Sequence, residues 1–283
     1  MMIPNKRRRR FEVTEVDEHD ELVCSSSPDR PKTKLKMVVG SSYFPKNNKL
    51  NPKGEDAHFI CEHKNTIGIA DGVGGWARHA VDSGIYAREL MSNCLVALDK
   101  EQIGAVNPKS VLQEAYSNTK AQGSSTACVL TLREDHILQA ANVDDSGFMI
   151  FRDNKLLFRS PTMQHGFNHP YQLGNHVRSD RPECADVIEI GFLEPGDIIV
   201  AGTDGVFDNI HPFEIVEVFE QTDGSVWPEQ HACMIASIAL ENSLDEDYLS
   251  PFQIAAEAAG QDYDGGKYDD ITVVVAMIES LKT

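Results

Sequence analysis

The apolar residues of this chain fall into many short runs, most of them typical of β-strands. The runs lie at residues 35–44, 57–62, 66–70, 124–132, 136–143, 148–152, 155–159, 187–190, 197–202 and 271–278. Several are separated by turns of only a few polar residues, so we expect neighbouring runs to pair as antiparallel strands. The last run is apolar on both faces, which predicts a strand inside a sheet rather than at its edge.

Five other segments are expected to be helical. They are residues 81–98, 108–121, 212–220, 228–242 and 251–259. Apolar residues recur at helical spacing in the first, and the second begins at Pro108, which the first turn of a helix tolerates. The order of elements predicts an α+β fold in which two packed, mainly antiparallel β-sheets are flanked by α-helices.

Residues 1–33 differ in character from the rest of the chain. A basic run at residues 6–10 is followed by an acidic run and a Ser-Pro stretch, and such blocks bury too little apolar surface to fold. We therefore expect a disordered, charged tail over 1–33 and one domain over 34–280. The basic run is either a nuclear-import signal or a solvated arm that carries no targeting signal. Residues 160–185 are expected to form a long polar loop.

Charge and cysteine content narrow the classes of function. The chain has 26 Lys and Arg against 44 Asp and Glu, a formal net charge of -18. This excess of acids argues against nucleic-acid and membrane-surface partners. The six cysteines are widely spaced, without the pattern of a disulfide framework or a zinc site. We expect an intracellular monomer in the cytoplasm or nucleus, since neither a secretory signal nor a clear transit peptide is present.

Acidic residues stand at the ends of several predicted strands. The run 67–70 stops at Asp71 and is followed by a glycine-rich stretch, and the run 198–202 leads through Thr203 to Asp204. One interpretation is that Asp71 caps the next helix. The other is that a carboxylate at a strand end, next to exposed peptide groups, presents oxygen ligands to a divalent cation.

The remaining acids favour the cation. Glu55-Asp56 and Asp269-Asp270 precede strands, and Asp144-Asp145 lies in a hairpin turn. Because the end of one antiparallel strand lies beside the start of its neighbour, all these positions can share one sheet edge. Carboxylates gathered there repel one another unless cations neutralise them. All-oxygen ligation suits magnesium or manganese, and a pair of such ions can activate a water to hydrolyse a phosphate ester.

Six short motifs, in order, resemble those of the metal-dependent type 2C (PPM) serine/threonine protein phosphatases. They are Gly54-Glu55-Asp56, Asp71-Gly72-Val73-Gly74-Gly75-Trp76, Gly123 to Ala127, Asn142 to Gly147, Thr203 to Asn209 and Asp269-Asp270-Ile271-Thr272. The second motif is similar to that of the subgroup with Asp-Gly-Val-Gly-Gly-Trp. The resemblance covers residues 35–278 and implies a sandwich of two β-sheets with two Mg or Mn ions and phosphorylated proteins as substrates.

The resemblance also implies roles for single residues. Asp71 would bridge both metals, Glu55 and the backbone carbonyl of Gly72 would complete one ion, and Asp204 and Asp269 would hold the other. Asp56 would orient a metal-bound water as the catalytic residue. Asp145 and Asp208 match the positions that hold a third, weaker ion in the family.

Three positions depart from the pattern of many relatives. Asn51 stands where they have the arginine that grips the phosphate, so the phosphate-binding group is unassigned. Val73 stands where they have a histidine that can protonate the leaving alkoxide. Asp144 replaces a glycine in the hairpin turn, which adds charge and is expected to strain the turn.

Three functions remain open at this point, one of which is hydrolysis of a small phosphorylated metabolite. Another is Mn- or Mg-dependent hydrolysis of phosphoserine and phosphothreonine in proteins. The alternative, which the three departures motivate, is a catalytically weak pseudophosphatase that binds phosphoproteins or serves as a scaffold.

Overall fold

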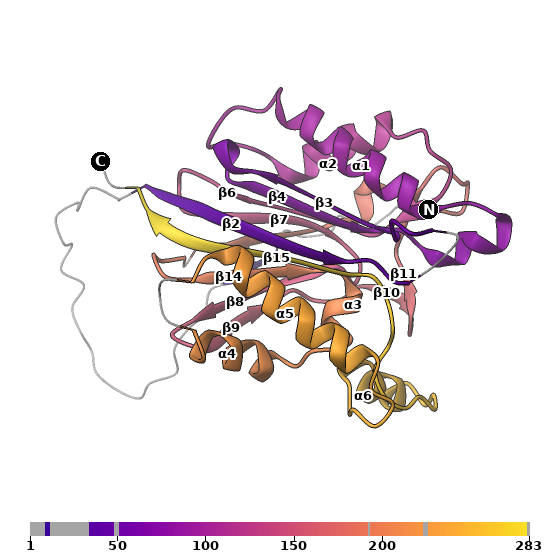
Figure 1. The fold of residues 1–283 in the computed structure, drawn as a ribbon. Helices are drawn as coiled ribbons and strands as arrows, with labels where there is room; N and C mark the ends of the chain where they lie inside the picture. Colours follow the sequence, from indigo (N-terminus) through magenta and orange to yellow (C-terminus); the bar gives the residue numbers. More distant parts are fainter. Residues whose placement is uncertain (1–8, 12–33, 48–50, 192, 223–225, 282–283) are drawn as a thin grey trace.

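Two β-sheets lie face to face, and helices cover the outer face of each (Figure 1). The computed structural model describes residues 9–11, 34–47, 51–191, 193–222 and 226–281. The predicted α+β sandwich is confirmed, since the order of layers is helix, sheet, sheet, helix.

The first sheet has six strands in the order β1-β13-β7-β6-β4-β3. Their bounds are β1 Arg9–Phe11, β3 Asp56–Cys61, β4 Thr66–Asp71, β6 Ala127–Leu132, β7 Leu138–Val143 and β13 Asp186–Ile190. Every neighbouring pair is antiparallel except β1 and β13, which are parallel.

The second sheet has five strands in the order β2-β15-β14-β8-β9, all antiparallel. Their bounds are β2 Leu35–Phe44, β8 Gly147–Arg152, β9 Lys155–Arg159, β14 Ile198–Gly202 and β15 Ile271–Ser280. As predicted from its two apolar faces, β15 lies inside the sheet, with β2 on one side and β14 on the other.

The helices α1 and α2 pack on the first sheet, whereas α4 and α5 pack on the second (Figure 1). The α-helices are α1 Ser83–Leu98, α2 Pro108–Asn118, α3 Asp204–Phe207, α4 Pro212–Glu220, α5 Pro228–Ser243 and α6 Pro251–Ala258. Three short 3-10 helices are η1 Glu62–Lys64, η2 Gly74–His79 and η3 Pro182–Cys184.

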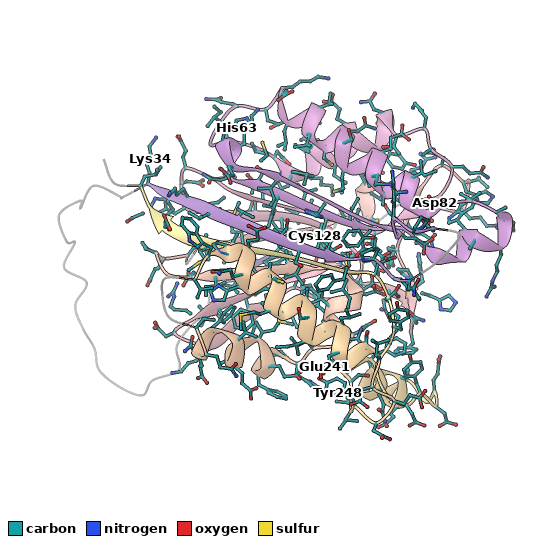
Figure 2. The ribbon with its side chains drawn as sticks, in the orientation of Figure 1. Lys34, His63, Asp82, Cys128, Glu241 and Tyr248 are labelled. Atoms are coloured by element: carbon teal, nitrogen blue, oxygen red, sulfur yellow. The ribbon has the colours of Figure 1, made fainter. Side chains whose placement is uncertain are left out.

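Alternating side chains of the strands build three apolar layers. On β15, Val274 points between the sheets and Val273 points toward the α4–α5 layer, because successive side chains of a strand face opposite ways. On β6, Cys128 lies between the sheets (Figure 2), and Val129 packs in the α1–α2 layer. Because these strands are buried on both faces, their ends are held in place. The acids at those ends are positioned in the same way.

Some predicted elements differ in detail. The predicted strand 124–132 is divided at Thr126 into β5 Ser124–Ser125 and β6. The predicted loop 160–185 contains η3 and the short strands β10 Gln164–Gly166, β11 His169–Pro170 and β12 Leu173–Gly174. The predicted tail 1–33 lies outside the described residues except for 9–11, and these three form β1 beside β13 rather than a free tail.

None of the described helices combines the length and the apolar character that crossing a bilayer requires. The five cysteines within the described residues form no disulfide, in agreement with their spacing in the sequence. Cys24 lies outside those residues.

Candidate metal centre

The register of both sheets brings the acid-bearing strand ends to one end of the sandwich. Asp56 opens β3 and pairs across the strands with Asp71, which closes β4. In the second sheet, Gly202 at the end of β14 pairs with Gly147 at the start of β8 and with Val273 near the start of β15. Acids next to these positions are therefore neighbours in space.

Asp56 joins the two sheets at this end. Its Oδ2 accepts hydrogen bonds from the hydroxyls of Thr203 (2.8 Å) and Thr272 (2.7 Å), which both belong to the second sheet's end. Its Oδ1 is buried and has no hydrogen-bond partner. Burial, then the charge of Asp270, raises the pKa of Asp56 well above its ordinary value. One Asp56 oxygen is therefore fixed and the other is open.

Asp71 lies among the other carboxylates of the cluster. Burial and then the charges of Asp204, Asp56 and Asp269 raise its pKa well above the ordinary value. Thr126 fixes its backbone, because the Asp71 N–H donates to Thr126 Oγ1 (3.2 Å) and the Thr126 N–H donates to the Asp71 carbonyl (2.9 Å). The structure thus brings three of the predicted partner acids around Asp71.

Asp71 does not cap the next helix. The first α-helix after it, α1, is capped by Asp82, whose side chain accepts from the Gly84 N–H. The 3-10 helix η2 begins after Val73 without a side-chain cap. The capping interpretation is therefore wrong, and the Asp71 carboxylate faces the cluster instead.

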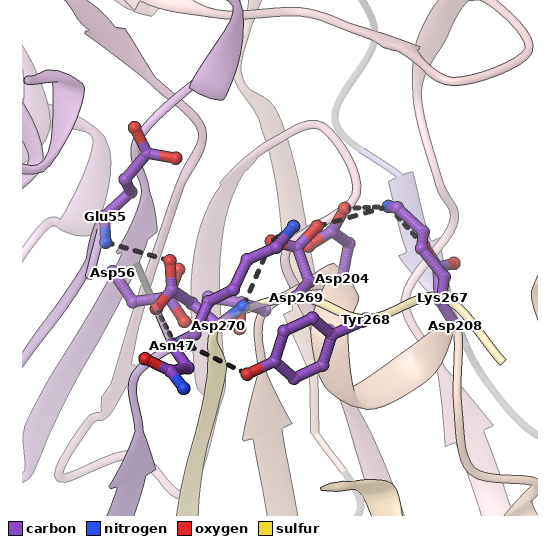
Figure 3. Close-up of polar contacts among 12 residues, drawn as sticks. Asn47, Glu55, Asp56, Asp204, Asp208, Lys267, Tyr268, Asp269 and Asp270 are labelled. Carbon is purple, nitrogen blue, oxygen red and sulfur yellow. Dashed lines mark hydrogen bonds and ion pairs between the residues drawn. The ribbon is translucent and has the colours of Figure 1, made fainter. Parts of the chain in front are cut away.

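Asp204, Asp208 and Asp269 gather around one lysine that the sequence reasoning missed (Figure 3). Lys267 Nζ bonds to Asp204 Oδ2, lies 2.7 Å from Asp208 Oδ2 and lies 3.9 Å from Asp269 Oδ2. Burial alone would lower the pKa of Lys267, but these carboxylates raise it well above its ordinary value. The indication of this contact in the sequence was that Lys267 lies two residues before Asp269.

Asp270 is a second residue whose role the sequence left open. Its Oδ2 accepts from the Glu55 N–H (2.9 Å), and its Oδ1 accepts from the Lys46 N–H (2.7 Å) and the Tyr43 hydroxyl (3.2 Å). It therefore ties the start of β15 to the end of β2 and to Glu55 (Figure 3). The two adjacent aspartates before β15 therefore have different partners, because Asp269 faces Lys267 and Asp270 accepts from backbone N–H groups.

The glycines next to the acids allow close approach. A Cβ at Gly72 would lie 2.8 Å from the Glu55 carbonyl, which accepts the Gly72 N–H at 3.0 Å. A Cβ at Gly205 would lie 1.9 Å from the Asp270 carbonyl. Larger residues there would push Asp71 and Asp204 away from their partners.

The Glu55 carboxylate points away from this cluster (Figure 3). Its Oε1 accepts from the Ser83 hydroxyl at 2.9 Å, and burial raises its pKa. The backbone places Glu55 beside Gly72, as predicted, but its side chain faces the start of α1.

The turn between β7 and β8 links the first sheet to the second, so the hairpin predicted at Asp144-Asp145 is wrong. The turn carries the buried Asp144 and the half-buried Asp145. Asp144 has φ +83 and is fully buried, and neither of its carboxylate oxygens has a hydrogen-bond partner. Burial raises the pKa of Asp144 to about 7. For Asp145, burial and then the charges of Asp204 and Asp144 raise the pKa well above the ordinary value. The turn therefore adds its charge to the same cluster.

The donor chemistry fits an oxygen-ligated divalent cation. Besides both oxygens of Asp144, one oxygen each of Asp56, Asp145 and Asp204 is buried without a partner. Such oxygens are costly unless a positive charge neutralises them. As the side chains stand, no group of three or more His, Cys, Asp or Glu in the described part of the chain is arranged to hold a metal ion.

Comparison with known proteins gives a consistent result, although no family model matches the chain. It is 45% identical to "Probable protein phosphatase 2C 55" of Arabidopsis thaliana over 88% of this chain and 53% of that relative. It is 39% identical to "Protein phosphatase PTC7 homolog fig" of Drosophila grimshawi over 87% of this chain and 86% of that relative. The chain belongs to the protein phosphatase 2C family.

Solved structures agree with this family. The fold matches that of the photosystem II phosphatase PBCP with a TM-score of 0.81, at 32% identity over 87% of this chain and all of that one. A more distant match, at 16% identity and a TM-score of 0.59, is the catalytic domain of the serine/threonine phosphatase PstP, which was solved with two manganese ions. The second match shows the fold alone. The chain spans about half the length of its first Arabidopsis relative.

Asn51 and Val73 are two of the positions at which this protein phosphatase 2C chain departs from the motif pattern. Asn51 Nδ2 donates to Asp82 Oδ1 (2.8 Å), and Arg88 donates to Asp82 Oδ2 (3.1 Å) and to the Gly54 carbonyl (2.9 Å). Asn51 is thus part of a local network at the start of α1. The aliphatic side chain of Val73 has no proton to give.

A cavity of about 530 Å³ lies beside the glycine-rich loop of this chain. It is lined by Val73, Gly75, Trp76, His79, Gln122, Gln172, His176, Arg178 and Ser179. An arginine and two histidines are among these residues, and no acid is. In a chain of net charge -18, this wall is locally basic.

Proposed function

We propose that this chain hydrolyses phosphoserine and phosphothreonine in proteins with the help of two Mg or Mn ions. The observation that carries the proposal is the buried carboxylate cluster at the common end of both sheets, with open oxygens on Asp56 and Asp204. Asp71, Glu55 and the Gly72 carbonyl would hold one ion, and Asp71, Asp204 and Asp269 the other. When bound, such ions lower the pKa of a water and stabilise charge on phosphoryl oxygens.

The chain's own residues position the reactants. Thr203 and Thr272 hold one oxygen of Asp56, which leaves Asp56 Oδ1 as an acceptor for a proton of the attacking water. Asp270 holds the Glu55 backbone at the edge of the site. Since Val73 carries no proton, the alkoxide that leaves must take its proton from another donor.

The substrate would extend from the carboxylate cluster into the basic cavity. Trp76 forms part of its wall, and the Trp76 Nε1–H donates to Ser124 Oγ (2.6 Å), which in turn donates to Gln172. These bonds join the Asp71–Trp76 motif to the loop that carries Arg178. The motif itself places the chain in this subgroup in our proposal, and we take a phosphoprotein rather than a small phosphorylated metabolite as the substrate. We expect the enzyme to act as a monomer inside the cell.

The test is turnover of a phosphopeptide by purified protein with manganese. Wild-type protein should release phosphate, and Asp204→Ala should lose the activity because it removes an oxygen at the centre of the cluster. Asp262→Ala is the matched control, since Asp262 is an exposed acid outside the cluster. Full turnover in excess chelator would contradict the metal-dependent reaction. Manganese binding without turnover of any phosphopeptide would favour the alternative, a phosphoprotein-binding pseudophosphatase.

A further inference from the structure

Lys267 places a fixed positive charge inside the carboxylate cluster. Its side chain is only 15% exposed, and its Nζ contacts Asp204 Oδ2 and Asp208 Oδ2 (Figure 3). The Nζ also lies 4.9 Å from the centre of the Phe252 ring, which favours a cation at that place. The ammonium therefore has partners on several sides.

The backbone of Lys267 is held as firmly as its side chain. Buried Asn209 accepts the Lys267 N–H through Oδ1 (2.7 Å) and donates through Nδ2 to the Lys267 carbonyl (2.8 Å). The same Nδ2 donates to the Gly205 carbonyl (2.9 Å). Asn209 therefore ties the backbone of Lys267 to α3, the helix that begins at Asp204.

The contacts of Lys267 coincide with the ligands expected for a third ion. Asp208 is bound by its Nζ, and the charge of Lys267 also acts on Asp145, the other expected ligand. Asp204 divides its oxygens, since Oδ2 bonds to Lys267 and Oδ1 is left without a partner. A divalent ion next to an ammonium would be repelled, whereas an ion on the Asp204 Oδ1 side would not have to displace it. Residues Asp145 and Asp208 therefore do not fit a third metal ion as long as Lys267 lies there.

We propose that the Lys267 ammonium takes the place of the third metal ion, so that the chain binds two divalent cations and no third. Lys267 thereby neutralises Asp208 and one oxygen of Asp204 at every cation concentration. This proposal rests on the two-ion site proposed above. Its test therefore counts bound ions and does not depend on turnover.

The experiment is a calorimetric titration of chelator-treated full-length protein with MnCl2. Wild type should bind two ions, and Lys267→Met should bind a third, because removal of the ammonium leaves Asp145 and Asp208 uncompensated. Lys267→Arg keeps the charge and should bind two. The double variant Lys267→Met/Asp208→Asn should lose the extra ion again. Lys155→Met is the matched control, since Lys155 is an exposed lysine on β9, outside the cluster, and should leave the count at two.

Two results would overturn the proposal. One is a wild-type count of three, which needs no variant and so does not depend on how Lys267→Met folds. The other is an unchanged count in a Lys267→Met protein whose circular dichroism and cooperative unfolding match those of wild type. Loss of phosphatase activity with a count of two would instead contradict the proposed function and leave the role of Lys267 standing.

Discussion

Asp144 combines two unfavourable features, a backbone in the left-handed region and a buried carboxylate. Its backbone lies in the left-handed region, where a side chain is disfavoured, and its buried carboxylate has no partner. Asp153, in the hairpin between β8 and β9, has a φ of +48 but an exposed side chain. The two aspartates therefore share backbone strain and differ in burial.

We predict that Asp144→Gly stabilises the metal-free protein by about 1–3 kcal/mol, because it removes both the strained backbone and the unpaired charge. Urea unfolding in chelator measures the change. Asp153→Gly is the control and should gain less, since only backbone strain is relieved there. Equal gains from both substitutions would show that burial of the Asp144 carboxylate costs nothing.

At the scale of elements, η2 and the loop after β12 meet over a basic cavity next to the glycine-rich loop. Arg178 is its one arginine, whereas Arg181, three residues further on, does not line it. In the proposed function, cations held by the carboxylate cluster would bind the reacting phosphate, so residues flanking the phosphoserine would meet this wall. Its charge should therefore select acidic neighbours.

We predict that Arg178→Gln lowers kcat/KM about five-fold for a phosphopeptide with acidic flanking residues, the effect of about 1 kcal/mol of lost pairing at an exposed site. Hydrolysis of a small aryl phosphate should not change. Arg181→Gln is the matched control in the same loop. A uniform loss on acidic, neutral and small substrates would argue against a role in substrate selection.

The junction of α4 and α5 contains a buried histidine that responds to pH. His231 Nε2 is 2.8 Å from Thr222 Oγ1, while its Nδ1 is buried without a partner. Burial lowers the pKa of His231 below its ordinary value of 6.5. As the pH falls below about 6.5, His231 therefore binds a proton in the unfolded chain while it stays neutral in the folded chain. Its contribution to stability is complete above that pH and is lost as the pH falls below it.

We predict that the wild-type melting temperature falls more between pH 7.5 and 5.5 than that of His231→Leu, which cannot titrate. At pH 5.5, one unit below the ordinary pKa, the loss can reach about 1.4 kcal/mol. Thermal unfolding of both proteins in chelator at the two pH values measures the difference. Parallel falls in the two proteins would show that His231 does not contribute.

At the scale of the whole molecule, the two sheets are joined at the end where the acids lie. Asp56 bonds from one sheet to threonines of the other, and Asp71 lies close enough to Asp204 and Asp269 for their charges to raise its pKa. Repulsion among these acids works against the packing of the sandwich, and cations would reverse that. Stability and cation binding should therefore be coupled.

We predict that Asp71→Asn has opposite effects with and without cations. In chelator the variant should melt at a higher temperature than wild type, because a crowded buried charge is gone. In manganese at about 100 times the dissociation constant, wild type should gain about 2.7 kcal/mol and the variant much less. Thermal unfolding in both conditions tests this, and a variant less stable than wild type in chelator would contradict it.

The hydrophobic pattern was sufficient for most of the long strands and for the pairs β3–β4, β6–β7 and β8–β9, but not for β7 and β8, which lie in different sheets. Runs with polar turns between them predicted the antiparallel sheets, and two apolar faces placed β15 inside one. Acids at strand ends were expected to be able to share an edge, because the end of one antiparallel strand lies beside the start of its neighbour. These conclusions depend on local order along the chain, which a sequence displays directly.

Tertiary structure alone decided which groups meet within that edge. The contact of Lys267 with Asp208, the division of labour between Asp269 and Asp270, and the turn of Glu55 toward Ser83 each depend on side-chain direction. So does the choice of Asp82, and not Asp71, as the cap of α1. Spacing along the chain carries no information on these directions, because packing between distant segments sets them. The sequence by itself determined that acids gather at one end of a two-sheet sandwich, and the fold determined that a lysine lies among them.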